Sequence, residues 1–155
     1  MPIRILSVRQ PWSWALIHGG KDVENRNWST NYRGLLAIHA GKAFDMTKDD
    51  FADMALGQYG EPFSTMAWSY CADPENADLR GAIIGVVELV GCIPDSQCES
   101  PWKAGGDGFF CWQVQKPVAL ADPITYKGML GLGKLPDHFE TTLRDAWLEA
   151  WPDPS

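Results

Sequence analysis

Three ionic side chains lie close together near the start of the sequence, within residues 19–26. This segment reads Gly-Gly-Lys-Asp-Val-Glu-Asn-Arg, so Lys21, Glu24 and Arg26 fall within six residues. Side chains on an extended strand alternate between its two faces, which places Glu24 and Arg26 on one face and Lys21 at the entry corner. Such a set is either an exposed turn with an ion pair or the polar lining of a ligand pocket.

Two kinds of chemistry suit these groups. A lysine acts as a general base only when burial or a neighbouring cation lowers its pKa. The nearby carboxylate opposes this, so we expect Lys21 to stay charged and to hold a phosphate or oxyanion, with Glu24 the better base for activating water. In a binding module the carboxylate and guanidinium would instead read a base edge, and Trp12 or Trp28 would stack on the base.

The elements that position these side chains can be predicted from the apolar pattern. β-Branched residues predict a first strand over residues 3–8. Pro11 and a pair of glycines delimit a short helix over residues 12–18, which is stable only if Trp12 or Trp14 is buried. Further strands are predicted at residues 22–28, 35–40, 81–92, 109–115 and 118–120, and an amphipathic helix at 139–151.

The remaining segments have weaker patterns. Residues 41–60 contain apolar side chains at helical spacing. Residues 61–80 are predicted as a long loop with a short helix near 66–71, and this loop is the best candidate for a mobile lid. Residues 126–136 are glycine-rich and are predicted as a loop, without the G-x-G-x-x-G order of a phosphate-binding turn.

Five or six short strands with glycine corners and few helices predict an α+β fold. We expect a small, mostly antiparallel β-barrel of five or six strands with flanking short helices. The length of 155 residues fits a single domain over residues 1–155. Its core would span about 5–135, with the C-terminal helix at about 139–151.

The charge distribution restricts the ligand classes. The chain has a net charge of −7, yet residues 1–42 contain six basic and two acidic residues. An acidic protein with a basic first third does not coat long duplexes, but it can present one local anion site. No apolar run has the length of a membrane span and no signal peptide is recognisable, so we expect a cytoplasmic protein without membrane association.

The four cysteines are scattered and form no C-x-x-C pair, which favours free thiols. The minor alternative is a zinc site built from Cys92, Cys98, Cys111 and a histidine. We expect no metal and no other cofactor.

The run Leu6-Ser7-Val8-Arg9-Gln10-Pro11-Trp12, taken with residues 19–26, resembles the ASCH domain of the PUA-like superfamily. The G-x-K-x-x-E-x-R signature of that family matches Gly19, Lys21, Glu24 and Arg26, and the resemblance covers roughly residues 5–135. It implies a PUA-like barrel with a cleft lined by the signature. The ligand-binding residues expected on this basis are Ser7, Gln10, Trp12, Lys21, Glu24, Arg26, Arg33 and His39. The apolar strand around His39 also fits a hydrogen-bonded core histidine.

The resemblance implies a role in RNA binding or RNA-linked metabolism. One branch of the family hydrolyses N4-acetylcytidine with a Lys, a Thr and a Glu: Lys21 matches the Lys, Glu24 occupies the Thr position, and Glu88 is a candidate for the third residue. Another branch consists of ribonucleases. We therefore expect a module that binds RNA or a modified nucleoside or nucleotide, without an obligate protein partner. The alternative is an amidohydrolase or ribonuclease with Lys21 and Glu24 as catalytic residues.

A third hypothesis is a protein-interaction module that uses the C-terminal helix. It requires an apolar patch on the folded surface, and burial of both Trp147 and Trp151 would exclude it.

Overall fold

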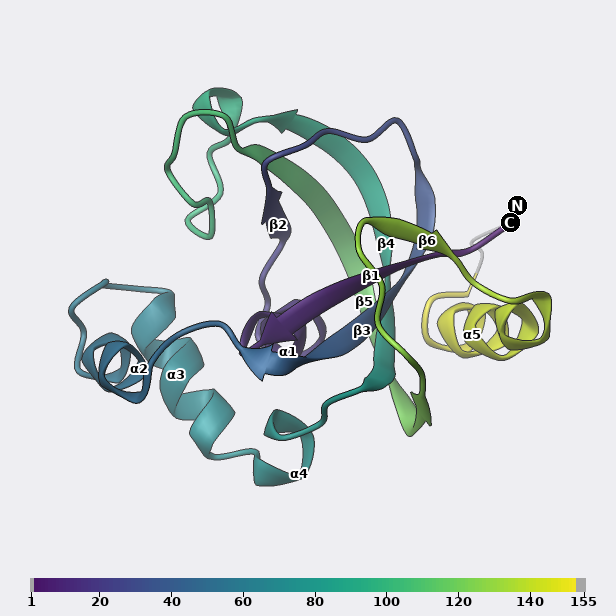
Figure 1. Cartoon of the computed structure of the whole chain (residues 1–155), viewed down its shortest axis with the longest axis horizontal. Helices are drawn as coiled ribbons and strands as arrows, with labels where there is room; N and C mark the ends of the chain where they lie inside the picture. Colours follow the sequence, from purple (N-terminus) through teal and green to yellow (C-terminus); the bar gives the residue numbers. More distant parts are fainter. Residues whose placement is uncertain (1, 153–155) are drawn as a thin grey trace.

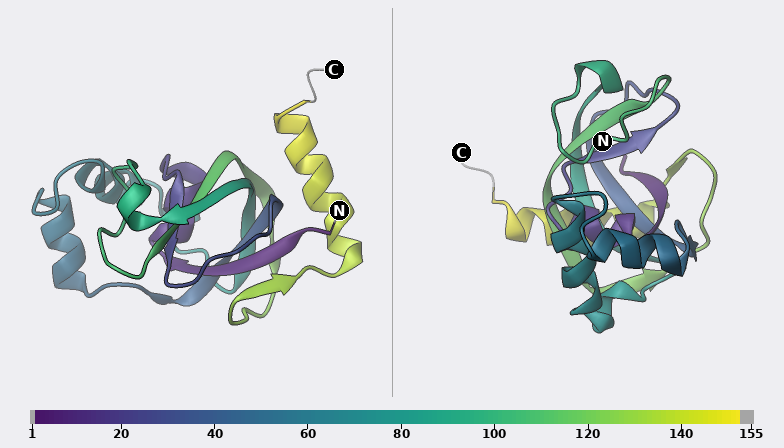
Figure 2. Two further views of the ribbon diagram at one scale, coloured as in Figure 1. Left: turned by 90° about the horizontal axis from the view of Figure 1, so that it is seen from above. Right: turned by 90° about the vertical axis from the view of Figure 1, so that its left-hand side faces the viewer.

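The computed structural model describes residues 2–152, which form an α+β fold around a six-stranded sheet (Figure 1). The strands are β1 (Arg4–Gln10), β2 (Val23–Arg26), β3 (Gly34–Phe44), β4 (Ala82–Pro94), β5 (Phe110–Thr125) and β6 (Leu132–Lys134). The helices are α1 (Trp12–His18), α2 (Lys48–Ala55), α3 (Phe63–Cys71), α4 (Pro74–Ala77) and α5 (Asp137–Ala150), with a 3-10 turn at Asp95–Gln97. Helices α2 and α3 lie at one end of the molecule and α5 lies at the other (Figure 2).

The sheet has the order β2-β5-β4-β3-β1-β6, and β1–β3 is its one parallel pair. The predicted α+β class, the strand number and the mostly antiparallel pairing are therefore confirmed. The strand pairing does not close into the predicted barrel, because the described edge strands β2 and β6 are not paired with each other. These edges have only four and three residues, too few to complete a ladder around the molecule.

A side chain spans part of the gap that strand pairing leaves open. Arg26 on β2 donates a hydrogen bond from Nη2 to the carbonyl of Ser7 on β1, at 2.8 Å, although four other strand pairings separate the two strands in the sheet. The sheet is thus curled enough for β2 to face β1. We call the gap between β2 and residues 7–9 of β1 the seam.

Helix α1 matches its prediction residue for residue. Pro11 precedes its first turn and Gly19 follows its last, and the helix buries Trp14, which is 3% exposed. At Gly20 the backbone φ is +76°, a conformation that glycine adopts without strain. This turn lets the Lys21 amide donate to the carbonyl of Ala15, so the end of α1 fixes the start of the functional segment.

Tertiary packing changes three of the predictions. Residues 61–80 do not form a long loop: the short helix predicted near residues 66–71 is part of α3, which is followed by α4, because Met66, Ala67 and Tyr70 pack into the apolar cluster beside α1. The two strands predicted on either side of Pro117 are one continuous β5, which accommodates Pro117 where its register with β4 shifts. The predicted loop 126–136 contains β6, which pairs with β1.

Helix α5 covers the end of the sheet opposite to α2 and α3. Leu143 is fully buried, and Phe139 and Trp147 pack against the same cluster as Ile3 and Ile5. Trp151 remains 39% exposed, so the hypothesis that this helix binds a protein partner stays a prediction. Within residues 2–152 we find no helix that has both the length and the apolar character to span a membrane.

Candidate functional site

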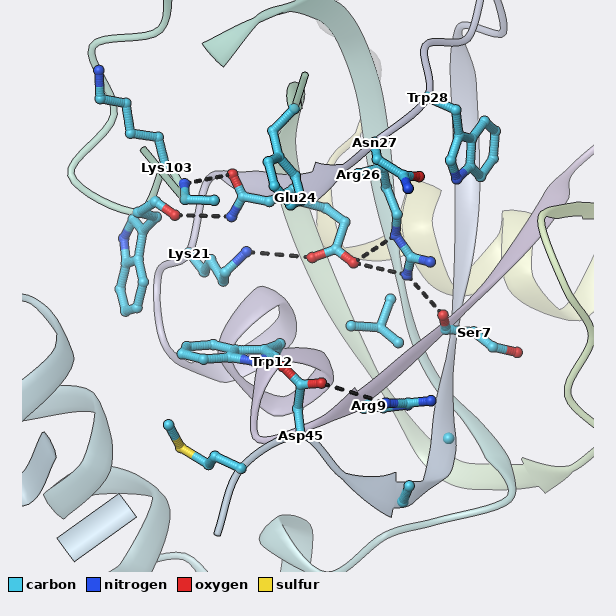
Figure 3. A pocket seen from close by; sticks show the side chains of 18 of the residues that line it. Ser7, Arg9, Trp12, Lys21, Glu24, Arg26, Asn27, Trp28, Asp45 and Lys103 are labelled. Atoms are coloured by element: carbon cyan, nitrogen blue, oxygen red, sulfur yellow. Dashed lines mark hydrogen bonds and ion pairs between the residues drawn. The ribbon is translucent and has the colours of Figure 1, made fainter. Parts of the chain in front are cut away.

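A pocket of about 990 Å³ opens at the seam, between β2 and residues 7–9 of β1 (Figure 3). Its lining combines cationic and aromatic side chains. The charged members are Arg9, Lys21, Arg26, Lys42 and Lys103, against Glu24 and Asp45. The aromatic members are Trp12, Trp28, Tyr59, Phe63, Trp102 and Phe109. An acidic protein therefore presents a predominantly basic, aromatic-walled pocket.

Lys21, Glu24 and Arg26 form one connected ion network, which we call the triad. Lys21 Nζ lies 3.4 Å from Glu24 Oε1, and Arg26 approaches Oε2 with Nε at 3.0 Å and with Nη2 at 2.8 Å (Figure 3). Lys21 and Glu24 are only 4% and 6% exposed. The segment is thus the floor of a pocket rather than an exposed turn, and the triad carries one net positive charge.

Glu24 has little remaining capacity for chemistry. Both of its oxygens face cationic donors, and Arg26 directs two N–H groups at one of them. A carboxylate engaged in this way organises the cations around it. The expectation that Glu24 is the better base for activating water stays a prediction.

Burial lowers the pKa of Lys21 below the ordinary lysine value. The Glu24 carboxylate opposes this shift through its charge and its hydrogen bond, while Arg26 adds to it. The Lys21 side chain is so completely removed from water that desolvation outweighs the ion pair in this shift; that Lys21 stays charged remains a prediction. Lys21 also donates to the carbonyl of Val23 and lies 5.8 Å from the centroid of the Trp12 ring.

Donor groups remain available for a ligand in this pocket. Arg26 uses Nε for Glu24 and Nη2 for Glu24 and Ser7, and its Nη1 has no hydrogen-bond partner among the described residues. A charged lysine has three N–H donors, of which Val23 and Glu24 engage two. The floor of the pocket thus favours a ligand group that accepts hydrogen bonds, such as a phosphate or a carbonyl oxygen.

The Trp12 ring is held in a fixed orientation at the pocket wall. Its Nε1 donates to Asp45 Oδ2 at 2.8 Å, and Asp45 also lies 3.7 Å from Arg9. Phe63 packs against Trp12 in a T-shaped arrangement, with the ring centroids 6.2 Å apart. A tryptophan that is anchored at its polar end and supported by an aromatic neighbour is a suitable stacking platform for a planar ligand.

A distant loop supplies another wall of the pocket. The Asn25 side chain accepts a hydrogen bond from the amide of Ala104 at 2.9 Å and donates to the carbonyl of Trp102 at 3.0 Å. These two bonds hold Trp102 and Lys103 at the pocket, across more than seventy residues of chain. Strand β2 therefore has two roles at the pocket. Glu24 and Arg26 form the ion pair of the floor, and Asn25, which lies between them in the sequence, holds the loop at residues 102–104.

The structure brings five of the predicted ligand-binding residues together at the pocket: Ser7, Trp12, Lys21, Glu24 and Arg26. It does not bring the other three there. The Gln10 side chain is fully buried and bonds the backbone of Trp14 and Leu79, and exposed Arg33 donates to the carbonyls of Thr30 and Tyr32.

His39 is a core histidine, the second of the two predicted roles, and is only 2% exposed. Its Nε2 lies 2.6 Å from the carbonyl of Tyr126 and therefore carries the proton, so Nδ1 accepts from the Ser7 hydroxyl at 3.0 Å. Ser7 Oγ in turn accepts from the amide of Met129 at 3.3 Å. His39 thus positions Ser7 and the loop beside it. Glu88 lies outside the pocket lining and accepts a hydrogen bond from Gln115 at 2.7 Å.

Sequence reasoning missed the pocket residues that come from loops. Asp45, Trp102, Lys103 and Phe109 lie far along the chain from the triad, and no periodicity marks them. The one available signal is the Trp102-Lys103 pair in a loop rich in Gly and Pro, since an aromatic beside a cation is typical of ligand-binding loops. No group of three or more His, Cys, Asp or Glu side chains within residues 2–152 could hold a metal ion.

The fold and pocket define an α+β domain with a ligand-sized cavity at the seam of a curled, open sheet. The profile of the ASCH domain family matches residues 6–124, and the chain belongs to this family, as the sequence motifs indicated.

Comparison with known proteins places the chain beside larger relatives. Activating signal cointegrator 1 from Homo sapiens and from Mus musculus are each 26% identical to this chain over 133 residues, covering 84% of this chain and 22% of each relative. The chain thus spans about a fifth of the length of these curated relatives. A crystal structure of ASCH from Zymomonas mobilis has a TM-score of 0.51 and 12% sequence identity, over 93% of this chain and 94% of that one. This similarity supports the fold alone.

Proposed function

We propose that the chain is a binding module for RNA or a modified nucleotide, with the ligand in the pocket at the seam. The observation that carries the proposal is the combination of a net positive lining with six aromatic side chains, in a protein of net charge −7. Nucleotides join a flat base to an anionic phosphate, and proteins recognise unpaired nucleotides by stacking and cationic contacts. Membership of the ASCH family is consistent with this class of ligand.

The proposed recognition divides between a wall and the floor of the pocket. The base stacks on Trp12, whose ring is oriented by Asp45. Arg26 Nη1 and Lys21 Nζ donate to a phosphate or a base carbonyl. Glu24 acts indirectly. Its negative charge pairs with both Lys21 and Arg26 and offsets the repulsion between these two cations.

Titration of the wild-type protein with the four nucleoside monophosphates, N4-acetylcytidine and a short mixed-sequence RNA tests this proposal. Tryptophan fluorescence reports binding directly, because Trp12, Trp28 and Trp102 line the pocket. We expect saturable one-to-one binding of at least one of these ligands, and a large loss of affinity in Arg26→Gln. Lys134→Gln on β6, outside the pocket lining, is the matched control. No binding of any ligand even at low salt would refute the proposal.

A second candidate function is hydrolysis of an N-acylated nucleoside or of RNA. The observation that favours it is the lowered pKa of Lys21, since a lysine that loses its proton more readily can act as a base or nucleophile. Incubation with N4-acetylcytidine and with RNA, followed by mass spectrometry of the products, tests it. Turnover that disappears in Lys21→Met would support hydrolysis, whereas unchanged substrates after long incubation would leave the binding proposal as the better one.

A further inference from the structure

Three basic side chains from neighbouring segments lie outside the pocket floor, and the triad does not use them. Arg9 on β1, Lys42 on β3 and Arg80, which precedes β4, come together where their segments meet. Arg80 Nη1 donates to the carbonyl of Lys42 at 2.9 Å, and its guanidinium lies 5.7 Å from the centroid of the Phe44 ring. We call Arg9, Lys42 and Arg80 the basic strip.

The basic strip is continuous with the pocket. Arg9 and Lys42 line the pocket, whereas Arg80 lies beyond its lining. The aliphatic part of the Arg9 side chain lies beside Gly41, where a Cβ atom would be 3.6 Å from Arg9 Cγ. The Lys42 side chain lies beside Gly81 in the same way, with a Cβ atom there 3.8 Å from Lys42 Cε. The strip therefore leads from the mouth of the pocket onto the surface.

These charges are not explained by ion pairing within the protein. Arg9 lies 3.7 Å from Asp45, but Asp45 also accepts the Trp12 hydrogen bond, and the Arg9 side chain remains 65% exposed. Lys42 and Arg80 are exposed and form no ion pair among the described residues. A cluster of solvent-facing cations beside a nucleotide-sized pocket fits an anionic ligand that extends out of it.

On the opposite side of the triad lies another cation. Figure 3 shows Lys103, on the loop that Asn25 anchors, across the pocket from Arg9. A mononucleotide has one phosphate group, which the triad floor can satisfy alone. Cations on both sides of the pocket floor fit a polynucleotide ligand that enters the pocket on one side and leaves it on the other.

We propose, on the basis of the proposed function, that the ligand is a single-stranded RNA that crosses the pocket. One nucleotide occupies the pocket, and the phosphates next to it contact the basic strip. A single strand fits better than a duplex, because paired bases are stacked within the helix and do not reach a pocket lined by Trp12 and the triad.

The test compares one short mixed-sequence RNA with the nucleoside monophosphates, over a series of salt concentrations. We expect the RNA to bind more tightly than any monophosphate and with a steeper salt dependence. Arg80→Ala should weaken RNA binding roughly threefold to tenfold and reduce the slope of log K against log salt by about 0.7, the value for one phosphate contact on a single strand. Monophosphate affinity should not change, because Arg80 is outside the pocket.

Two further variants separate charge from folding. Arg80→Lys keeps the charge and should retain most of the RNA affinity, and Lys134→Ala, an exposed lysine on β6, should have no effect. Thermal melting of each variant shows whether Arg80→Ala also disturbs the contact with Phe44. If RNA binds no more tightly than a monophosphate, or if Arg80→Ala lowers both affinities equally, the basic strip is not a phosphate site while the nucleotide pocket stands. If neither ligand binds, the proposed function itself fails and the strip proposal fails with it.

Discussion

The substitution Glu24→Gln tests the view that this carboxylate holds two cations together. Glutamine has nearly the same shape, but it removes the negative charge that lies 3.4 Å from Lys21 and 2.8 Å from Arg26. Lys21 is 4% exposed, so little of its side chain is hydrated where it lies. Arg26 has a side chain that is 24% exposed and can be hydrated in place.

The expected loss of unfolding free energy follows from this difference in burial between Lys21 and Arg26. Breaking a buried ion pair by removing one partner costs about 3–5 kcal/mol of unfolding free energy. Because only Lys21 is left fully buried without its partner, we expect a loss of about 3 kcal/mol, at the lower end of that range. For a domain of this size, that loss corresponds to a decrease in Tm of roughly 6–12 °C.

Urea unfolding followed by tryptophan fluorescence near neutral pH measures this loss. Glu88→Gln is the matched control, because Glu88 lies outside the pocket and bonds Gln115 on the adjacent strand. Its effect should stay within about 0.5 kcal/mol. The double variant Lys21→Met with Glu24→Gln should recover much of the lost stability, since it removes the buried charge that Glu24→Gln leaves unpaired. A Glu24→Gln variant as stable as wild type would refute the reasoning.

The same variant has a predictable pH dependence. Burial lowers the pKa of Lys21 in the folded protein, so the unfolded chain binds more protons than the folded one at pH values between the lowered pKa and 10.5. Stability from this group therefore rises with pH across that window. Loss of the Glu24 charge lowers the folded pKa further, so the destabilisation by Glu24→Gln should shrink as pH rises toward 10.5. A deficit that grows with pH would contradict this account.

Three further predictions concern the pocket wall, the loop and the thiols. Trp12→Ala should weaken nucleotide binding by about 1–3 kcal/mol and Trp12→Phe by much less, as measured by titration; equal effects would argue against stacking. Asn25→Ala should raise amide hydrogen exchange at residues 102–104 while β5 stays protected, because both anchoring hydrogen bonds are lost. Burial and the neighbouring thiol of Cys98 raise the pKa of Cys111 to about 12, so iodoacetamide at mildly alkaline pH should modify exposed Cys71 well before Cys111. Similar alkylation rates in the folded protein would contradict this prediction.

Local signals in the sequence predicted the segment that carries the triad. Proline before α1 and glycine after it mark the boundaries of the helix, and the spacing of Lys21, Glu24 and Arg26 indicates a shared site. The same reasoning could not exclude Gln10 from the predicted ligand-binding residues. Nothing in a sequence shows that the oxygen and the nitrogen of this amide will bond the backbones of Trp14 and Leu79. Whether a polar side chain finds its hydrogen-bond partners within the protein depends on the tertiary fold.

Sequence also could not predict the loop wall or the open sheet. The Trp102 carbonyl accepts a hydrogen bond from Asn25, and the Trp102 ring packs against Phe63; Asn25 and Trp102 are separated by 77 positions, so no local pattern reveals this contact. Strand counting predicted the right number of strands but not the absence of closure, which depends on how few residues β2 and β6 contribute. For Lys21, sequence gives the identity of the charged neighbour but not the degree of burial that lowers the pKa of this side chain; that Lys21 stays charged remains a prediction.

The pocket exists because strand pairing leaves the seam open. Strand pairing between β2 and residues 7–9 of β1 would fill the seam with backbone hydrogen bonds and leave no room for a ligand. Here Arg26 spans the seam instead, using one donor group for Ser7 and keeping Nη1 unpartnered among the described residues. A ligand that binds Nη1 and the β1 side of the pocket would therefore join the same two strands that the sheet leaves apart. Ligand binding and closure of the seam should stabilise each other, because any ligand that prefers the folded state raises its stability by mass action.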